Sequence, residues 1–376
     1  MQLDLTPDQK TFQATARKAL EKEVPLTRIR EMVEAGEPFD RDWWAAGAEL
    51  GWTAMLVPEE LGGGTVSGEG LRDLAIIAEE FGRGVVPGPL IPVNVVLAGL
   101  VEVVPDQPHH AETVEALLAG EAVATWAAYE PGEEWAPLAP RTVAKPSAEG
   151  FLIDGTKDRV EVARSADLLL VLASAPEGTS QFLVPASAPG VTITPTPGID
   201  LTRDLAEVRF DRVEVPASAM VGPAGDVAAL VERQLQVALA LQLADTCGAL
   251  GSAFDLSVQW AFDRYSFGRP LASYQALKHR WADQKTWLEA SLATTEAAVR
   301  AVGARTDDAA ELVSVAKSYV GDRAVEVIQD TVQLFGGIGV TYEHDAHFYL
   351  RRATANRYLY GTPTEHRQRL ARQLAG

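Results

Sequence analysis

The sequence predicts an α+β protein of three consecutive parts: a helical N-terminal domain, a middle β domain and a C-terminal helical bundle. Three observations along the 376 residues indicate this order. Helical periodicity dominates up to about residue 119, short β-branched segments separated by turn residues follow, and long helical patterns fill the rest. We therefore place the domains at 1–119, 120–221 and 222–376.

The N-terminal domain is expected to begin with a helix capped by Thr6, because Pro7 follows at the first helical position. Apolar residues then recur every four positions and share one helical face: Phe12, Ala16, Leu20 and Val24. Further helices are predicted at 40–50, 69–81, 89–101 and 111–118. A glycine-rich loop at 57–64 interrupts them.

The middle domain has a different pattern of short, often β-branched segments bounded by Gly, Pro, Ser or Asp. This spacing is typical of a small antiparallel sandwich or barrel. The predicted strands are 122–129, 141–144, 150–154, 159–162, 168–173, 181–185, 191–195 and 205–215.

The C-terminal part is helical again, and its helices are long. Long helices joined by short loops predict an antiparallel bundle. The predicted helices are 227–265, 274–302, 307–334, 343–359 and 364–374.

Composition argues against several classes of binding partner and site. A formal net charge of −19 opposes binding to nucleic acid or an anionic membrane. The only cysteine, Cys247, excludes a disulfide within the chain and a zinc–thiolate cluster, so no metal site is expected. The first residues lack a basic and apolar leader, and no apolar run approaches 18 residues. We expect a cytoplasmic protein.

Several motifs then point to a family. The segment Gln333-Leu-Phe-Gly-Gly-Ile-Gly, the later Tyr360-Gly-Thr and the upstream Arg264-Tyr-Ser-Phe-Gly together resemble the acyl-CoA dehydrogenase family. Weaker fragments occur in the expected order around Leu61-Gly-Gly and Glu79-Glu-Phe-Gly. The resemblance implies the three-domain order given above, an FAD cofactor and α,β-dehydrogenation of an acyl-CoA thioester.

One set of family residues is retained. In the family, an arginine, a phenylalanine, two glutamines and a glycine turn reach across a dimer interface to the neighbour's FAD. Arginine offers a cationic fork suited to a pyrophosphate, and glycine lets backbone approach a cofactor closely. The matching residues here are Arg264, Phe267, Gln275, Gln333, Gly336 and Gly337. Thr362 matches a residue that contacts FAD within one subunit.

A second set is altered. Tyr129 replaces a threonine that contacts the flavin ring, and Glu133 and Glu134 stand where small residues hold the thioester. Arg159 and Glu161 take the places of a tryptophan that walls the flavin and a threonine that bonds it.

The catalytic position itself is changed. The usual base glutamate is Tyr360, whose phenol titrates near 10 and cannot act as a strong base at neutral pH. The nearest substitutes are Asp245 and Glu365, which more simply line a polar seam and charge a helix N-terminus. Losing a general base typically costs ~10²–10⁴ in rate.

Contacts made to a neighbour's flavin are intact, whereas contacts made within the subunit are degraded, Thr362 excepted. This asymmetry predicts the base-lacking subunit of a heteromeric, steroid-type α₂β₂ acyl-CoA dehydrogenase, whose second acyl-CoA dehydrogenase chain supplies the base. A steroid side-chain CoA is the substrate suggested by that resemblance. Two alternatives stay open: a homomeric dehydrogenase with a displaced base at Asp245 or Glu365, and a flavin-free scaffold on the same fold.

Overall fold

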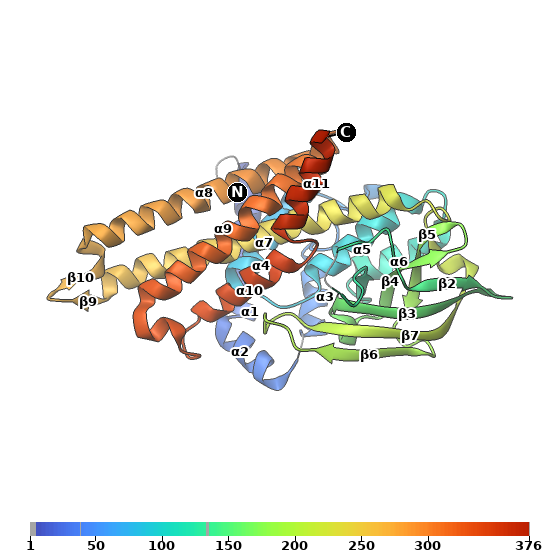
Figure 1. The fold of residues 1–376 in the computed structure, drawn as a ribbon, viewed down its shortest axis with the longest axis horizontal. Helices are drawn as coiled ribbons and strands as arrows, with labels where there is room; N and C mark the ends of the chain where they lie inside the picture. Colours follow the sequence, from blue (N-terminus) through green and yellow to red (C-terminus); the bar gives the residue numbers. More distant parts are fainter. Residues whose placement is uncertain (1–4, 38, 133–134, 376) are drawn as a thin grey trace.

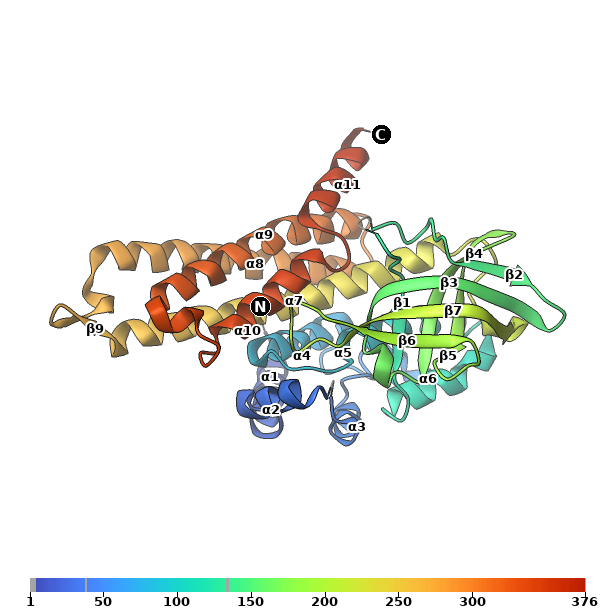
Figure 2. The ribbon, with the colours of Figure 1, turned by 60° about the horizontal axis from the view of Figure 1, so that its bottom comes forward.

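The computed structural model describes residues 5–37, 39–132 and 135–375. Residues 1–4, Glu133 and Glu134, which entered the sequence predictions, lie outside that part. A group of N-terminal helices, a middle sheet and a C-terminal bundle follow one another along the chain. The sheet lies at one end of the elongated molecule, and the free end of the bundle lies at the other (Figures 1 and 2). The predicted fold class is confirmed.

The N-terminal domain starts with helix α1 (Pro7–Glu23), whose N-cap is Thr6 as predicted. The Thr6 hydroxyl accepts from the Gln9 N–H while the Gln9 side chain accepts from the Thr6 N–H, which completes a capping box. The sequence prediction missed α2 (Leu26–Ala35), which ends at Gly36 in the left-handed region. The other helices are α3 (Arg41–Glu49), η1 (Glu59–Leu61), α4 (Gly70–Gly84), α5 (Leu90–Val103), η2 (Pro108–His110) and α6 (Ala111–Leu118).

The middle domain is one eight-stranded sheet in the order β6-β7-β3-β2-β4-β5-β8, with β1 paired to β4. Most neighbouring strands pair antiparallel, as predicted, but β1 and β2 both pair parallel with β4. The strands are β1 (Ala124–Ala127), β2 (Val143–Pro146), β3 (Gly150–Glu161), β4 (Leu168–Ala175), β5 (Gly178–Pro185), β6 (Val191–Thr196), β7 (Leu205–Pro216) and β8 (Met220–Val221).

The predicted strands 150–154 and 159–162 are a single strand, β3. Its pairing with β7 shifts register after Ile153 and again after Lys157, which lets one strand continue through a polar stretch. Glu161 lies at the end of β3 and is therefore directed toward the bundle side of the domain, where it meets Tyr360.

The C-terminal domain is built around α7 (Ala228–Asp263), and its long helices agree with the predicted bundle. This helix is long and apolar enough to cross a membrane by composition, an exception to the sequence expectation, yet 94% of its apolar window is buried within the protein. The other elements are β9 (Tyr265–Ser266), β10 (Arg269–Pro270), η5 (Leu271–Ser273), α8 (Gln275–Ala304), α9 (Ala309–Phe335), η6 (Gly336–Val340), α10 (Ala346–Tyr358) and α11 (Pro363–Ala375).

Helices α4 and α7 cross at two glycines, which ties the N-terminal domain to the bundle. A Cβ on Gly82 would lie 1.8 Å from the Asp245 carbonyl oxygen, and a Cβ on Gly248 would lie 1.9 Å from that of Glu79. Only glycine permits this approach. The crossing brings Asp245 of α7 close to the C-terminal end of α4.

Candidate functional site

The residues that match the family's cross-subunit contacts gather at the free end of the bundle, here called the tip. They come from the end of α7, the β9–β10 hairpin, the start of α8, the end of α9 and η6, elements that meet at the left of Figure 1. They are Arg264, Phe267, Gln275, Gln333, Gly336 and Gly337. The chain therefore assembles these six predictions, up to 73 positions apart in sequence (264 to 337), in one region.

The tip presents its side chains outward. Phe267 is 97% exposed, at a φ of 50° that holds it at the hairpin turn. The Arg264 guanidinium lies 5.9 Å from the Trp260 ring and has no carboxylate partner among the described residues. A Cβ on Gly337 would meet nothing within 4 Å, so packing within the chain does not require glycine there.

Exposed apolar side chains occur on the same elements as these residues. They are Phe262, Tyr265, Phe267, Ile338, Val340 and Tyr342, with Val340 79% exposed. Single exposed apolar residues are ordinary, but several on a few neighbouring segments favour a contact surface. A cation, an aromatic ring and bare backbone on an apolar surface suit contact with a nucleotide cofactor and a protein partner.

The altered residues converge at a second, interior place between the sheet and the bundle. The Tyr129 hydroxyl accepts hydrogen bonds from the backbone N–H groups of Tyr360 and Gly361. The Arg159 guanidinium lies 4.4 Å from the Tyr129 ring, and the Tyr360 hydroxyl donates to Glu161 at 3.2 Å. Four positions singled out for departing from the family pattern thus contact one another.

Aromatic rings close this interior place. Tyr129 lies 4.5 Å from Trp135, and Trp135 lies 6.2 Å from Tyr360. Trp126 lies 6.4 Å from Tyr360 in a stacked arrangement. We call Trp126, Tyr129, Trp135 and Tyr360 the ring cluster. Among the positions matched to flavin contacts in the family, Tyr129 is bonded to the Tyr360 turn and the Arg159 guanidinium lies over its ring, so the residues present do not fit a flavin ring here.

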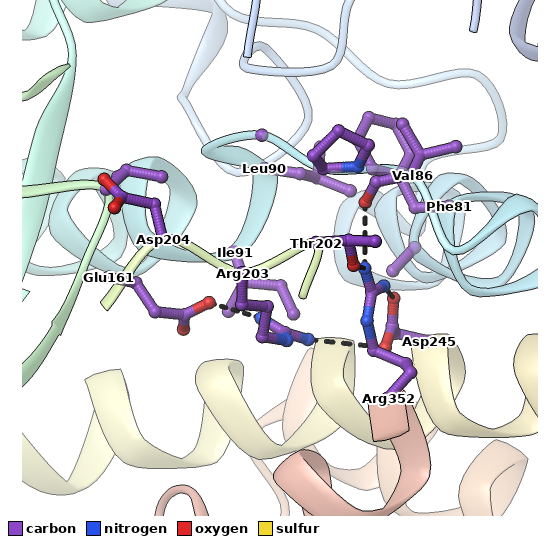
Figure 3. Close-up of a pocket in the computed structure, with 14 residues that line it drawn as sticks. Phe81, Val86, Leu90, Ile91, Glu161, Thr202, Arg203, Asp204, Asp245 and Arg352 are labelled. Atoms are coloured by element: carbon purple, nitrogen blue, oxygen red, sulfur yellow. Dashed lines mark hydrogen bonds and ion pairs between the residues drawn. The ribbon is translucent and has the colours of Figure 1, made fainter. Parts of the chain in front are cut away.

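A buried ion network adjoins the ring cluster through Glu161, which accepts from the Tyr360 hydroxyl. Figure 3 shows Glu161, Arg203, Asp245 and Arg352 of this network. Arg203 pairs with Glu161 and lies 3.4 Å from Asp245. Arg352 pairs with Asp200 at 2.6 Å and with Asp245 at 2.7 Å. The remaining Arg352 hydrogen bonds go to the end of α4 and to the β6–β7 loop, at Val85, Val86 and Thr202. The network joins all three domains and lines a small pocket of about 20 Å³, room for about one water.

The two substitute bases are already engaged. Asp245 accepts from Arg352, Arg203 and the Asn356 amide, and it is buried. Glu365 accepts from the Thr362 N–H at 2.6 Å, the Thr362 hydroxyl at 2.7 Å and the Trp135 N–H at 3.0 Å. Burial would raise the pKa of Glu365, but these hydrogen bonds outweigh burial and lower it.

Thr362 thus lies apart from the tip, at the start of α11 beside Tyr360. Burial raises the pKa of the Tyr360 phenol well above its ordinary value, and the Glu161 carboxylate raises it further. Tyr360 has a φ of 62°, and Gly361 follows at 89°. The buried Lys317 side chain holds this turn because its Nζ donates to the carbonyls of Asn356 and Leu359. The Tyr360 phenol therefore stays protonated near neutral pH and cannot accept a substrate proton there.

His366 holds the same turn and makes it sensitive to acid. Its Nε2 lies 2.9 Å from the Tyr360 carbonyl oxygen, and burial lowers its pKa from 6.5 to about 4. Below pH 6.5 the His366 imidazole takes up a proton in the unfolded chain but stays neutral in the folded chain. The free energy of unfolding therefore falls as the pH is lowered to about 4. Between pH 7 and pH 5 we expect His366 to cost about 2 kcal/mol.

Urea unfolding at both pH values measures this cost. Between pH 7 and pH 5, the free energy of unfolding of His366→Gln should fall by about 2 kcal/mol less than that of the wild type. The control His109→Gln, at an exposed position, should show the same fall as the wild type. Equal losses in the wild type and His366→Gln would show that His366 does not set the acid sensitivity.

Several residues of the interior place were not predicted. Arg203, Arg352 and Trp126 carry no motif, and their roles depend on partners far away in sequence. Trp135 follows the altered Tyr129 loop, and this large residue among expected small ones was the available signal.

The chain is similar to known proteins over almost its whole length. Residues 6–121 match the model of the acyl-CoA dehydrogenase N-terminal domain, and residues 228–375 match that of the acyl-CoA dehydrogenase C-terminal domain. Acyl-CoA dehydrogenase IpdE2 of Mycolicibacterium smegmatis is 28% identical over 97% of this chain and 98% of its own length.

Two solved structures are similar in fold. A variant of the Tcur3481-Tcur3483 steroid acyl-CoA dehydrogenase has a TM-score of 0.87 at 29% identity, covering 98% of this chain and 97% of that one. The ChsE4-ChsE5 complex from Mycobacterium tuberculosis has a TM-score of 0.86 at 24% identity, covering 100% and 99%.

Proposed function

Since the chain belongs to the acyl-CoA dehydrogenase family, we propose that it is one subunit of a heteromeric, FAD-dependent enzyme. In this proposal it joins a second acyl-CoA dehydrogenase chain in a cytoplasmic α₂β₂ heterotetramer. The observation that carries the proposal is that the tip is open to contact whereas the interior place around the ring cluster is filled. The tip is exposed and its cation lacks a carboxylate partner among the described residues, whereas the interior place is closed by side chains bonded to one another.

The tip would contact FAD bound mainly by the partner. When bound, FAD supplies the hydride acceptor for α,β-dehydrogenation, which protein side chains do not provide. Arg264 would offer its guanidinium to the pyrophosphate, because charge-assisted hydrogen bonds to phosphate are strong. Gly336 and Gly337 would admit the cofactor near the backbone, and Phe267 would pack at the interface.

The partner is proposed to supply the carboxylate that removes the substrate's α-proton. A homomeric enzyme would need Asp245 or Glu365 for this step. Asp245 is held by two arginines and an amide, and Glu365 by three donors, so neither carboxylate is free to approach a thioester. These contacts favour the heteromer over the homomeric alternative.

A scaffold without flavin is the remaining alternative. Such a protein would gain nothing from an outward arginine beside two glycines that the chain's own packing leaves open. The proposed substrate is a steroid side-chain CoA, in which the side chain of the steroid forms the acyl group. Likeness to a steroid acyl-CoA dehydrogenase that shares 29% identity with this chain supports it.

Purification of the chain alone and with its partner tests the proposal. The partner used is the acyl-CoA dehydrogenase chain of the same genome neighbourhood that carries a glutamate base. The chain alone should neither bind FAD tightly nor turn over substrate. The chain with its partner should form an α₂β₂ species that has flavin absorbance and oxidises a steroid side-chain CoA. Tight FAD binding with turnover by the chain alone would refute the proposal, and a flavin-free pair would favour the scaffold.

A further inference from the structure

Arg30 of α2 reaches from the N-terminal domain to a loop that begins where the glycine turn of the tip ends. Its Nε and Nη2 atoms lie 3.1 and 2.6 Å from the Asp345 carboxylate. Its Nη1 donates to the Tyr342 carbonyl at 3.0 Å, and Nη2 donates to the Glu343 carbonyl at 3.2 Å. The fixed fork of the guanidinium thus binds one short loop, 312 to 315 positions away in sequence.

Aromatic contacts reinforce these hydrogen bonds. The Arg30 guanidinium lies 4.9 Å from the Phe348 ring and 5.8 Å from the Tyr342 ring. The Arg30 side chain is only 23% exposed, so the contacts form in a partly dehydrated place where they are stronger than on an open surface. His347 Nε2 donates to the same Tyr342 carbonyl at 3.1 Å.

The loop that Arg30 holds, residues 342–345, packs against the tip. The His344 ring lies 4.2 Å from Phe335, the residue before the glycine turn, and Phe335 lies 5.9 Å from Trp260. The Arg264 guanidinium lies 5.9 Å from that same Trp260 ring. A continuous series of contacts therefore runs from Arg30 to Arg264.

The glycine turn cannot fix its own position. Side chains are absent at Gly336 and Gly337, and a Cβ on either would meet nothing within 4 Å. Its anchors are Gly339, packed tightly against Val332 and Phe335, and the loop that Arg30 holds. A turn left mobile in the free protein would have to be ordered when the cofactor binds, which lowers affinity.

We propose that Arg30 is a positioning residue, which holds the glycine turn and Arg264 in place for the partner's FAD without touching the cofactor. This inference rests on the proposed function. It assigns to the N-terminal domain a part in nucleotide affinity, a role that none of the family motifs identified in the sequence gives to α2.

The test compares Arg30→Lys and Arg30→Met with Arg28→Met as the matched control. Lysine keeps the charge but loses the fork, so Arg30→Lys covers the case in which Arg30→Met folds poorly. Arg28 lies on the same helix and pairs with Asp40 at 2.7 Å. Hydrogen exchange is measured on the isolated chain, and FAD dissociation constant and kcat on the heteromeric complex.

In both Arg30 variants, amides 336–345 should exchange faster than in the wild type while the sheet is unchanged. The FAD dissociation constant should rise about tenfold, and kcat at saturating FAD should stay within about twofold. Arg28→Met should match the wild type. Unchanged exchange, or faster exchange with unchanged FAD affinity, would overturn the role of Arg30 alone. A wild-type complex without FAD would instead overturn the proposed function, and the inference with it.

Discussion

Replacing Arg264 by glutamine is expected to weaken FAD binding to the proposed heteromeric complex by about 10- to 100-fold. A hydrogen bond between a guanidinium and a phosphate contributes about 1.5–3 kcal/mol. Glutamine keeps a polar amide but loses the charge and the terminal fork of the guanidinium. Because Arg264 has no carboxylate partner among the described residues, its replacement leaves no buried charge unpaired in the chain itself. The folded state should therefore be unaffected.

Fluorescence titration of the apo complex with FAD measures this effect, and Arg269→Gln is the control. Arg269 lies on the same hairpin, but its guanidinium is stacked 3.9 Å from the Tyr274 ring. The control should bind FAD within about threefold of the wild type, as expected of a surface position. An equal loss in both variants would indicate a general electrostatic effect, and no loss in Arg264→Gln would remove the proposed contact with the pyrophosphate.

Replacing Arg352 by methionine should lower the free energy of unfolding by about 3–5 kcal/mol, because removal of one partner leaves buried charges uncompensated. Arg352 neutralises Asp200 and Asp245, and it also satisfies carbonyl groups at the end of α4. Arg203 lies 3.6 Å from Asp200 and 3.4 Å from Asp245, so it compensates only in part.

Urea unfolding of the isolated chain measures this loss. The neighbouring Arg351 makes one hydrogen bond to the Ile199 carbonyl at 3.0 Å and is half-buried. Arg351→Met should therefore cost less than about 1 kcal/mol. Adding Asp200→Asn and Asp245→Asn to Arg352→Met should recover part of the loss, since the buried charges are then removed. A loss below about 1 kcal/mol in Arg352→Met would mean that the network does not hold the domains together.

The order of the domains could be predicted from sequence because each domain has its own periodicity. Single elements were lost where local signals and tertiary pairing disagree. The polar residues around Asp158 interrupt the apolar pattern of β3, yet the pairing with β7 continues after a register shift. Helix α2 was missed although Pro25 and Gly36 mark its two ends, and its two buried residues, Ile29 and Met32, give a weak pattern.

The candidate site was predictable to a different degree at its two places. Motif spacing identified the tip residues and the altered residues separately. Contacts among the altered residues could not be predicted, because Tyr129 and Tyr360 are 231 positions apart and Glu161 and Tyr360 are 199 apart. Pairings at such separation depend on how the domains dock, which single-sequence periodicity does not encode.

The ring cluster also limits how this lineage could change. A glutamate at position 360 would face the Glu161 carboxylate across a buried space, with the Tyr129 hydroxyl still bound to the turn. Two carboxylates so close cannot both ionise readily. A working carboxylate at position 360 would therefore need a further substitution at Glu161, so we do not expect any single change to restore one there.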